Sequence, residues 1–170
     1  MSNPTRTMAD VRAPVVVFQV GMRINRLRSL RRWLPAFSAM PRMLRELATN
    51  PDLGMLGAKT YLSGRTIMVA TYWRSFEALE SYSRATDASH RPAWTAFYRR
   101  SAAGGGAVGI FHETYLVGPG AVESLYVDMP AGFGLGGAVG SIPVVGSLET
   151  ARGRRDRDGS GVDAGTRAVA

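Results

Sequence analysis

Apolar and polar positions follow the pattern of β-strands in four segments of the chain. Residues 15–25 (VVVFQVGMRIN) are rich in β-branched side chains, and we expect shorter strands at residues 55–62, 65–73 and 107–117. Such segments predict strands. The first half of residues 15–25 is apolar at both odd-numbered and even-numbered positions, so both faces of the strand are apolar. This indicates a central strand covered on both faces. The two middle strands are joined by a short turn, so we expect an antiparallel hairpin.

Between these strands the apolar positions take helical spacing. Residues 33–49 place apolar side chains three or four positions apart, and Pro41 in their middle predicts a kink or a split in that helix. Ser75 is a favourable N-cap for a second helix, which a polar stretch interrupts before a further helical segment at residues 92–102. The elements therefore follow one another as strand, helix, strand, strand, helix and strand.

This order predicts one α+β domain of ferredoxin-like βαββαβ type over residues 15–118. Its two helices would cover one face of the sheet. The first, third and fourth strands are apolar in both parities, so the other face needs a cover as well. A second copy of the sheet is the simplest cover, and it gives a homodimer with the architecture of a dimeric α/β barrel. The alternative cover is the chain's own segment at residues 121–148.

The segments on either side of this domain differ from it in composition. Residues 1–14 form a polar arm, residues 119–150 are a Gly-rich extension expected to wrap an existing surface, and residues 151–170 are polar and expected to be disordered. The arm lacks the apolar core of a signal peptide, and Gly and Pro residues break the apolar run at 131–145. We therefore expect a cytoplasmic protein without a membrane partner.

The formal net charge is +8, and Lys59 is the single lysine among 21 basic residues. Arginines cluster at residues 23–32 and again at residues 152–157. Arginine clusters can bind phosphates, but the chain has no recognised nucleic-acid-binding motif. Both clusters are therefore interpreted as solvated, and no nucleic-acid partner is expected. The absence of Cys excludes disulfides, thiolate metal sites and a Cys nucleophile.

Polar residues within the predicted strands are the candidates for a functional site. His112 lies in the middle of the last strand beside Glu113. Buried polar side chains need hydrogen-bond partners, so these residues either satisfy one another or face a ligand. We therefore expect a cavity for a small-molecule substrate between sheet and helices, with His112 and Glu113 as catalytic candidates. The substrate-binding candidates are Arg23, Asn25, Tyr72, Trp73, His90, Trp94 and Tyr98.

Each candidate also has a purely structural interpretation. His112 would then be a hydrogen-bonded strand residue, Glu113 would pair with an arginine of the basic loop, and the aromatic residues would belong to the core. His90 lies in a polar interruption and reaches either the surface or the mouth of the cavity. The sequence has no phosphate-binding loop and no His and Glu residues at metal-ligand spacing, so no metal is expected.

Six short blocks of the sequence, taken together, resemble one family. They are residues 21–25 (GMRIN), 33–35 (WLP), 40–43 (MPRM), 72–79 (YWRSFEAL), 92–94 (PAW) and 109–115 (GIFHETY). Over residues 15–130 the chain is similar to the monooxygenases related to the one of fumagillin biosynthesis. That family often has Trp at the position of Phe111, which is a conservative departure.

The resemblance implies the dimeric α/β-barrel superfamily, which includes antibiotic-biosynthesis monooxygenases and haem proteins. It implies an oxidoreductase that acts on a small hydrophobic or phenolic metabolite. His112 would deprotonate an electron-rich substrate that then reacts with O₂ without a cofactor, or it would bind haem iron through a ring nitrogen. Arg23 and Asn25 would hold a substrate oxyanion or a haem propionate. Haem, flavin and no cofactor all stay open.

Two further hypotheses use the same fold. One is a haem-binding or small-ligand-binding protein without oxygenase activity. The other concerns residues 140–149 (GSIPVVGSLE), which resemble the short peptides that dock cargo proteins into encapsulin shells. A Gly-rich turn packed on the domain is the simpler interpretation of that segment.

Overall fold

The computed structural model describes residues 5–85 and 106–159, and the chain divides into two compact units. The central unit comprises Val16–Tyr115, and the terminal unit combines Met1–Val15 with Leu116–Ala170. Each unit has a sheet of its own. The domain boundaries expected at residues 15 and 118 lie close to the borders between these units.

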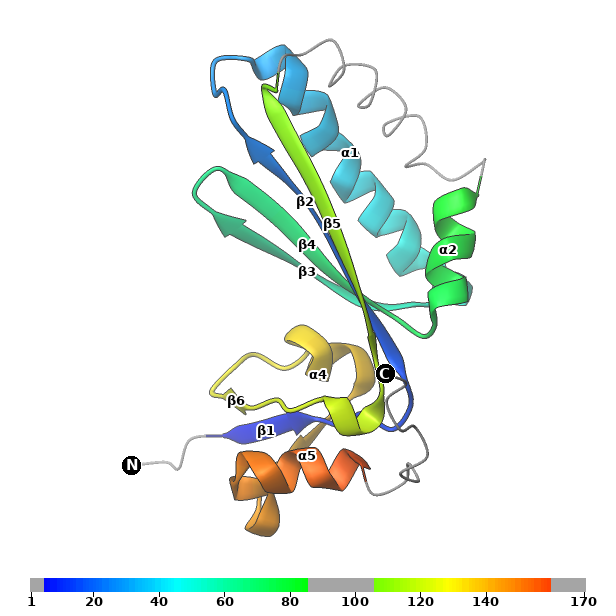
Figure 1. The fold of residues 1–170 in the computed structure, drawn as a ribbon, viewed down its shortest axis with the longest axis vertical. Helices are drawn as coiled ribbons and strands as arrows, with labels where there is room; N and C mark the ends of the chain where they lie inside the picture. Colours follow the sequence, from blue (N-terminus) through cyan, green and yellow to red (C-terminus); the bar gives the residue numbers. More distant parts are fainter. Residues whose placement is uncertain (1–4, 86–105, 160–170) are drawn as a thin grey trace, which may run out of the picture. The chain divides into compact units, whose positions relative to one another are not determined.

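The central unit is built on a four-stranded sheet in the order β3-β4-β2-β5. Helices α1 and α2 lie on one face of this sheet (Figure 1). The elements are β2 (Val15–Ile24), α1 (Leu30–Thr49), the 3₁₀ turn η1 (Pro51–Leu53), β3 (Met55–Ser63), β4 (Thr66–Trp73), α2 (Phe76–Arg84) and β5 (Val108–Val117). The predicted α+β class and ferredoxin-like fold are confirmed. The helical segment expected at residues 92–102 lies outside the described residues.

The register of the strands decides which side chains face the helices. β2 and β4 pair antiparallel, with Val16 opposite Trp73 and Phe18 opposite Thr71. Opposite residues of a pair lie on the same face of a sheet, and the faces alternate along each strand. The even-numbered residues of β2 therefore face the helices together with the odd-numbered residues of β4. β3 and β4 form the predicted antiparallel hairpin.

The core of the central unit joins this face of the sheet to both helices. Its buried members are Val16, Met43, Leu47, Trp73, Leu79 and Tyr82. Trp73 is 1% exposed, and its indole Nε1 donates a hydrogen bond of 2.8 Å to Thr71 Oγ1. The Thr71 hydroxyl in turn donates to the carbonyl oxygen of Phe18 at 3.0 Å. Both buried polar groups are therefore satisfied, and the indole ring is fixed against the sheet.

Helix α1 runs as one helix from Leu30 to Thr49, so the split expected at Pro41 does not occur. Proline removes only one backbone donor from a helix, and Pro41 lies on the exposed side of α1. The carbonyl group left without that donor can bind water there, while Met43 and Leu47 hold the helix against the core. Helix α2 begins as predicted, since Ser75 Oγ accepts a hydrogen bond of 3.2 Å from the backbone N–H of Ala78.

The terminal unit has a three-stranded antiparallel sheet in the order β6-β1-β7. Strand β1 precedes the central unit in the sequence, and both of its partners follow that unit. Figure 1 shows β1 beside β6. The elements are β1 (Arg6–Ala9), η2 (Pro119–Ala121), β6 (Tyr126–Val127), α4 (Gly134–Val139), β7 (Ser141–Pro143), η3 (Gly146–Glu149) and α5 (Ala151–Gly159).

This unit differs from the polar arm, wrapping extension and disordered tail expected from the sequence. Met8 and Val11 of the arm are buried. Residues 151–159 form helix α5, whose Arg154 is only 5% exposed. Its guanidinium pairs with Glu123 at 2.5 Å and donates to two carbonyl oxygens of η3. A helix anchored by one buried arginine carries no apolar periodicity, which is why its composition predicted disorder.

Residues 140–149, which resemble cargo-docking peptides, belong to this sheet and to the turn that follows it. Ile142 lies opposite Met8, and the backbone N–H of Val144 donates to the carbonyl oxygen of Arg6 at 2.9 Å. This arrangement agrees with a packed turn rather than a free peptide. The cargo hypothesis stays a prediction, and co-purification with a shell protein would test it.

Candidate active site

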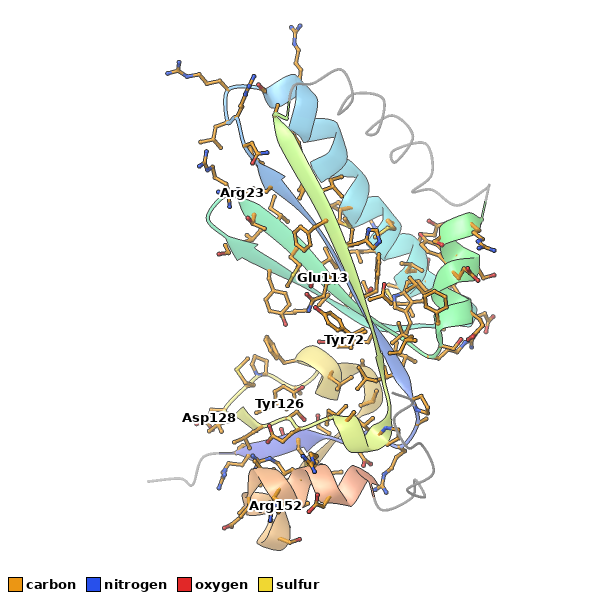
Figure 2. The ribbon with its side chains drawn as sticks, viewed as in Figure 1. Arg23, Tyr72, Glu113, Tyr126, Asp128 and Arg152 are labelled. Carbon is orange, nitrogen blue, oxygen red and sulfur yellow. The ribbon has the colours of Figure 1, made fainter. Side chains whose placement is uncertain are left out.

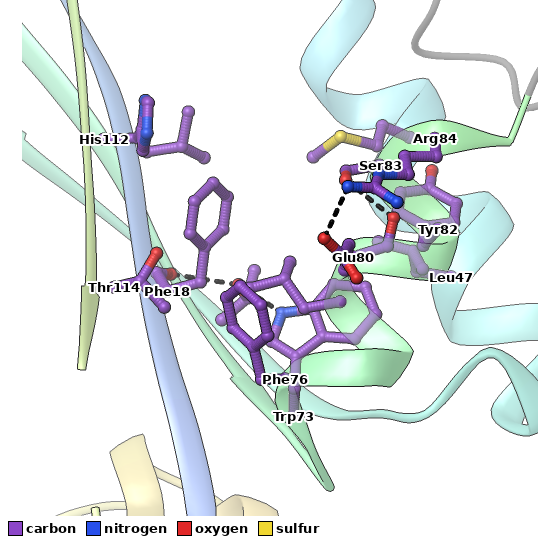
Figure 3. Close-up of a pocket in the computed structure, with 14 residues that line it drawn as sticks. Phe18, Leu47, Trp73, Phe76, Glu80, Tyr82, Ser83, Arg84, His112 and Thr114 are labelled. Atoms are coloured by element: carbon purple, nitrogen blue, oxygen red, sulfur yellow. Dashed lines mark hydrogen bonds and ion pairs between the residues drawn. The ribbon is translucent and has the colours of Figure 1, made fainter. Parts of the chain in front are cut away.

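A pocket of about 530 Å³ lies between the sheet and the helices of the central unit (Figure 3). Strands β2, β4 and β5 supply one wall, with Phe18, Trp73 and His112 among its side chains. Helices α1 and α2 supply the other wall, with Leu47 and Phe76 among theirs. Most of the lining is apolar or aromatic. A pocket of this volume and lining suits a small organic molecule.

His112 enters the lining from β5, the edge strand next to β2. Its ring centroid lies 5.9 Å from that of Phe18, and the two rings are inclined at 41°. Thr114 is two residues further along β5 and therefore lies on the same face. Figure 3 shows both side chains on one side of the pocket. His112 is also exposed to solvent.

Helix α2 places a second set of polar groups across the pocket from His112, as Figure 3 shows. These groups belong to Glu80, Ser83 and Arg84. Arg84 forms an ion pair with Glu80 at 2.8 Å, and Ser83 Oγ donates to the backbone carbonyl oxygen of Glu80 at 2.8 Å. An exposed pair of this kind adds little to stability. Polar side chains thus stand on two opposite sides of a largely apolar pocket.

Tyr82 adds a buried phenol to the lining and links the two helices. Its hydroxyl donates a hydrogen bond of 3.2 Å to Glu46 Oε2 on α1. Burial raises the pKa of Tyr82 well above its ordinary value of 10.0, and the negative charge of Glu46 and the hydrogen bond to it act in the same direction. The phenol therefore keeps its proton at neutral pH and serves as a hydrogen-bond donor.

The sheet divides the residues predicted for the site into two groups. His112 and Trp73 line the pocket. Arg23, Tyr72 and Glu113 lie on the opposite face of the sheet, because each alternates with neighbours that face the pocket. Figure 2 labels these three residues. The structure therefore brings His112 together with Trp73 but separates both from Arg23.

Two residues predicted for the site have partners away from the pocket. Asn25 Nδ2 donates to the carbonyl oxygen of Gly106 at 2.9 Å, which ties the end of β2 to the start of β5. Glu113 Oε2 accepts a hydrogen bond of 2.7 Å from the hydroxyl of Tyr115, and this bond raises the pKa of Tyr115. His90, Trp94 and Tyr98 lie outside the described residues. The roles expected for all of these residues stay predictions.

Several lining residues were not among the predicted ones. Thr71 is a polar residue at an odd-numbered position of β4, where Val69 and Trp73 are apolar, and that contrast was visible in the sequence. Glu80, Ser83 and Arg84 follow Phe76 at four, seven and eight positions, which is the spacing of one helix face. Only the fold shows that this face of α2 meets the pocket.

A metal ion and haem would each need particular ligands from the pocket. Within residues 5–85 and 106–159, no group of three or more His, Cys, Asp or Glu side chains could hold a metal ion. For haem the lining offers one nitrogen ligand, His112. The propionate partners inferred from the sequence do not accompany it, since Arg23 lies on the other face of the sheet and the Asn25 amide is bonded to Gly106. The described residues therefore do not fit that haem-binding set.

The chain is similar in sequence to known monooxygenases. A sequence model of the Monooxygenase af470-like family matches residues 15–135. Monooxygenase af470 of Aspergillus fumigatus is 28% identical over 124 residues, which cover 67% of this chain and 42% of that protein. The chain thus spans less than half the length of this curated relative.

Two solved structures resemble this one. A crystal structure of aldoxime dehydratase (OxdRE) in complex with butyraldoxime has a TM-score of 0.63 and 17% identity, over 78% of this chain and 39% of that chain. SnoaB, a cofactor-independent oxygenase from Streptomyces nogalater, has a TM-score of 0.44 and 13% identity, over 62% of this chain and 94% of that chain. The first likeness supports the fold alone. Because the family's sequence model matches well over half of the chain, the protein belongs to the Monooxygenase af470-like family.

Proposed function

We propose that this protein is a monooxygenase that oxidises a small hydrophobic or phenolic metabolite bound in the pocket of the central unit. Membership of a monooxygenase family supports this class of reaction. The observation that carries the proposal is the imidazole of His112, which is set into a largely apolar lining beside Phe18. A base in this position meets a hydrophobic substrate with few competing polar groups.

The walls of the pocket suit a flat aromatic body. Phe18, Trp73 and Phe76 all belong to the lining. Offset or edge-on contacts with such rings contribute about 0.5–1.5 kcal/mol each beyond the burial of apolar area. The indole N–H of Trp73 is already bonded to Thr71, so it is not available to a ligand. The polar groups of a bound substrate are then directed toward His112 and Thr114, or toward α2.

In the proposed reaction His112 acts as a general base. Its neutral imidazole takes a proton from an acidic C–H or O–H group of the substrate, and the Thr114 hydroxyl stabilises the resulting oxyanion by a hydrogen bond. The delocalised anion then reacts with O₂. When a CH₂ group becomes C=O, one oxygen atom enters the substrate and the other leaves in water. The substrate carbon supplies all four electrons, so the reaction needs no external reductant.

We also propose that two copies associate through the sheet face that turns away from the helices. Val17, Met68 and Phe111 lie on this face and are partly exposed. A second copy related by a twofold axis would cover them. Light scattering during size-exclusion chromatography would then give twice the monomer mass of 18.3 kDa, whereas a monomer at all concentrations would contradict this association.

The reaction is tested by incubating the purified protein with tricyclic phenols that carry an acidic CH₂ group, under ¹⁸O₂. The expected product contains one labelled oxygen atom and forms without added reductant. The absorbance spectrum is recorded on the same sample, before and after haem addition. A haem Soret band together with no oxidation of any phenol would instead favour a haem-binding protein. Ligand binding without oxidation and without a Soret band would favour a non-catalytic binding protein.

A further inference from the structure

The turn after β2 and the turn between β3 and β4 meet at one end of the central unit. The backbone N–H of Ile24 donates to the carbonyl oxygen of Arg65 at 2.8 Å, and Arg65 Nη1 donates to the carbonyl oxygen of Asn25 at 3.3 Å. Both turns lie at the end of the sheet where α1 begins (Figure 1). Two segments that are distant in sequence therefore form one surface, which we call the arginine end.

The charge of this surface has a single sign. Its exposed arginines are Arg26, Arg28, Arg31 and Arg65. None of them forms an ion pair with any residue that the structure describes. The sequence has no Asp or Glu between Asp10 and Glu46, and none between Asp52 and Glu77. Glu46 lies near the other end of α1, a helix about 30 Å long, so its charge does not neutralise this end.

Exposed leucines accompany these arginines. Leu27 is 55% exposed and stands in the turn between Arg26 and Arg28, and Leu62 is 74% exposed just before the turn between β3 and β4. Leu34 is 51% exposed and lies three residues after Arg31 on α1. These are the most exposed large hydrophobic residues among the described parts of the central unit. Leu27 and Leu62 thus stand next to the two turns that carry the arginines, and Leu34 follows on α1.

We propose that the arginine end docks the protein on the surface of an anionic membrane. Arginines attract the negative headgroups, and exposed leucines enter the boundary between headgroups and acyl chains. A nucleic acid would match the charge of the arginines equally well, but binding it would not bury the three exposed leucines. Such docking needs no membrane-spanning segment, and none of the helices within the described ranges is long and apolar enough to cross a bilayer.

The structure changes the interpretation of this basic segment. From the sequence alone, the arginines of residues 23–32 indicated a solvated loop. The structure brings Arg65 of the β3–β4 hairpin to the same end of the central unit, and the side chains of Leu27, Leu34 and Leu62 are each more than half exposed. The docking proposal is independent of the reaction proposed for His112, because none of its residues lines the pocket.

Sedimentation of the full chain with vesicles tests the proposal. We expect binding to vesicles that contain phosphatidylglycerol with phosphatidylcholine, weaker binding at high salt, and no binding to phosphatidylcholine alone. Arg26→Glu combined with Arg28→Glu is expected to lower the partition coefficient by about 25-fold or more, at about fivefold per arginine lost. Leu27→Ser combined with Leu62→Ser leaves the charge unchanged and is expected to lower it by roughly tenfold.

The matched control is Arg152→Glu combined with Arg155→Glu on helix α5, which changes the net charge by the same amount at two exposed arginines of the terminal unit. This variant is expected to bind vesicles as the unchanged protein does. Equal losses in the control and in the Arg26 and Arg28 variant would overturn the proposal, because net charge alone would then explain binding. Retained vesicle binding in the leucine variant, with tight binding of duplex RNA or DNA, would assign the surface to nucleic acid instead.

Discussion

The ring of His112 lies 5.9 Å from the ring of Phe18 on the neighbouring strand, at an inclination of 41°. This relationship places the imidazole on the face of the sheet that meets the helices. It also places the aromatic ring of Phe18 next to the imidazole, so a hydrophobic substrate in the pocket would contact both side chains. The adjacent carboxylate of Glu113 lies on the other face.

Replacement of His112 by Ala should lower kcat/KM for O₂-dependent oxidation by about 100-fold or more, because a positioned base contributes that much or more to proton abstraction. Glu113→Gln is the matched variant, since it removes a charge one residue away on the opposite face. It should leave kcat/KM close to that of the unchanged protein. Oxygen uptake measures both rates. Full activity in the His112 variant, or a comparable loss in the Glu113 variant, would contradict the assignment.

Gly21→Ala should destabilise the central unit by about 1–3 kcal/mol, which is typical of overpacking. A Cβ at Gly21 would lie 2.6 Å from the ring of Phe111 and 2.7 Å from the carbonyl oxygen of Ile67. Gly109→Ala on β5 is the control, because its Cβ would meet its nearest neighbour at an ordinary 3.7 Å. Urea denaturation gives both free energies of unfolding. Equal free energies of unfolding for the two variants would show that the Phe111 ring can move away from the new Cβ without loss of stability.

Thr71→Val should lower the free energy of unfolding by about 2 kcal/mol or more, because it leaves the indole N–H of Trp73 without its acceptor in a buried site. The change also removes the donor to the carbonyl oxygen of Phe18. Thr71→Ser keeps both hydrogen bonds and should cost only about 1 kcal/mol for the lost methyl group. Near-ultraviolet circular dichroism of the tryptophans reports whether the indole keeps its position. An undisturbed spectrum and stability in Thr71→Val would contradict this account.

Tyr82 should make stability fall at alkaline pH. The folded state raises its pKa above the ordinary value of 10.0, so above that pH the unfolded chain loses the proton more readily than the folded one. The contribution of Tyr82 to the free energy of unfolding is therefore complete below about pH 10, and it is lost as the pH rises above that value. Tyr82→Phe should weaken this dependence and, by removing the bond to Glu46, cost about 1–2 kcal/mol at neutral pH.

Urea denaturation one pH unit below and one pH unit above the ordinary pKa of tyrosine measures this effect. Tyr61→Phe on β3 is the control, since Tyr61 does not belong to the pocket lining. An alkaline loss of stability that is the same in both variants would show that Tyr82 is not its source.

The order and type of the elements in the central unit could be predicted because β-branched strands and apolar helix faces leave periodic patterns. The pattern within one strand also showed that Arg23 and Asn25 share a parity. It could not show whether the even-numbered or the odd-numbered residues of β5 lie on the same face of the sheet as Arg23. That depends on the register between two strands that are distant in sequence. For this reason His112 and Arg23 were placed in one candidate site, although the sheet separates them.

The terminal unit left weaker signals. β1 has only four residues, too few to show alternation, and its partners lie more than a hundred residues further along the chain. Helix α5 is polar, and it is anchored by the buried side chain of Arg154, which pairs with Glu123, rather than by an apolar stripe. Sequence periodicity does not detect a short strand whose partners are distant in sequence. It also does not detect a helix that is anchored by a charged side chain.

The pairing of Thr7 with Pro143 has a consequence for the order in which the chain folds. During synthesis β1 leaves the ribosome before the central domain, but β7 follows only after that domain is complete. Met8 must therefore remain without Ile142, its partner on β7, while the central sheet forms. Strand β1 is therefore made before the central sheet but is paired only after that sheet, when β7 has been made.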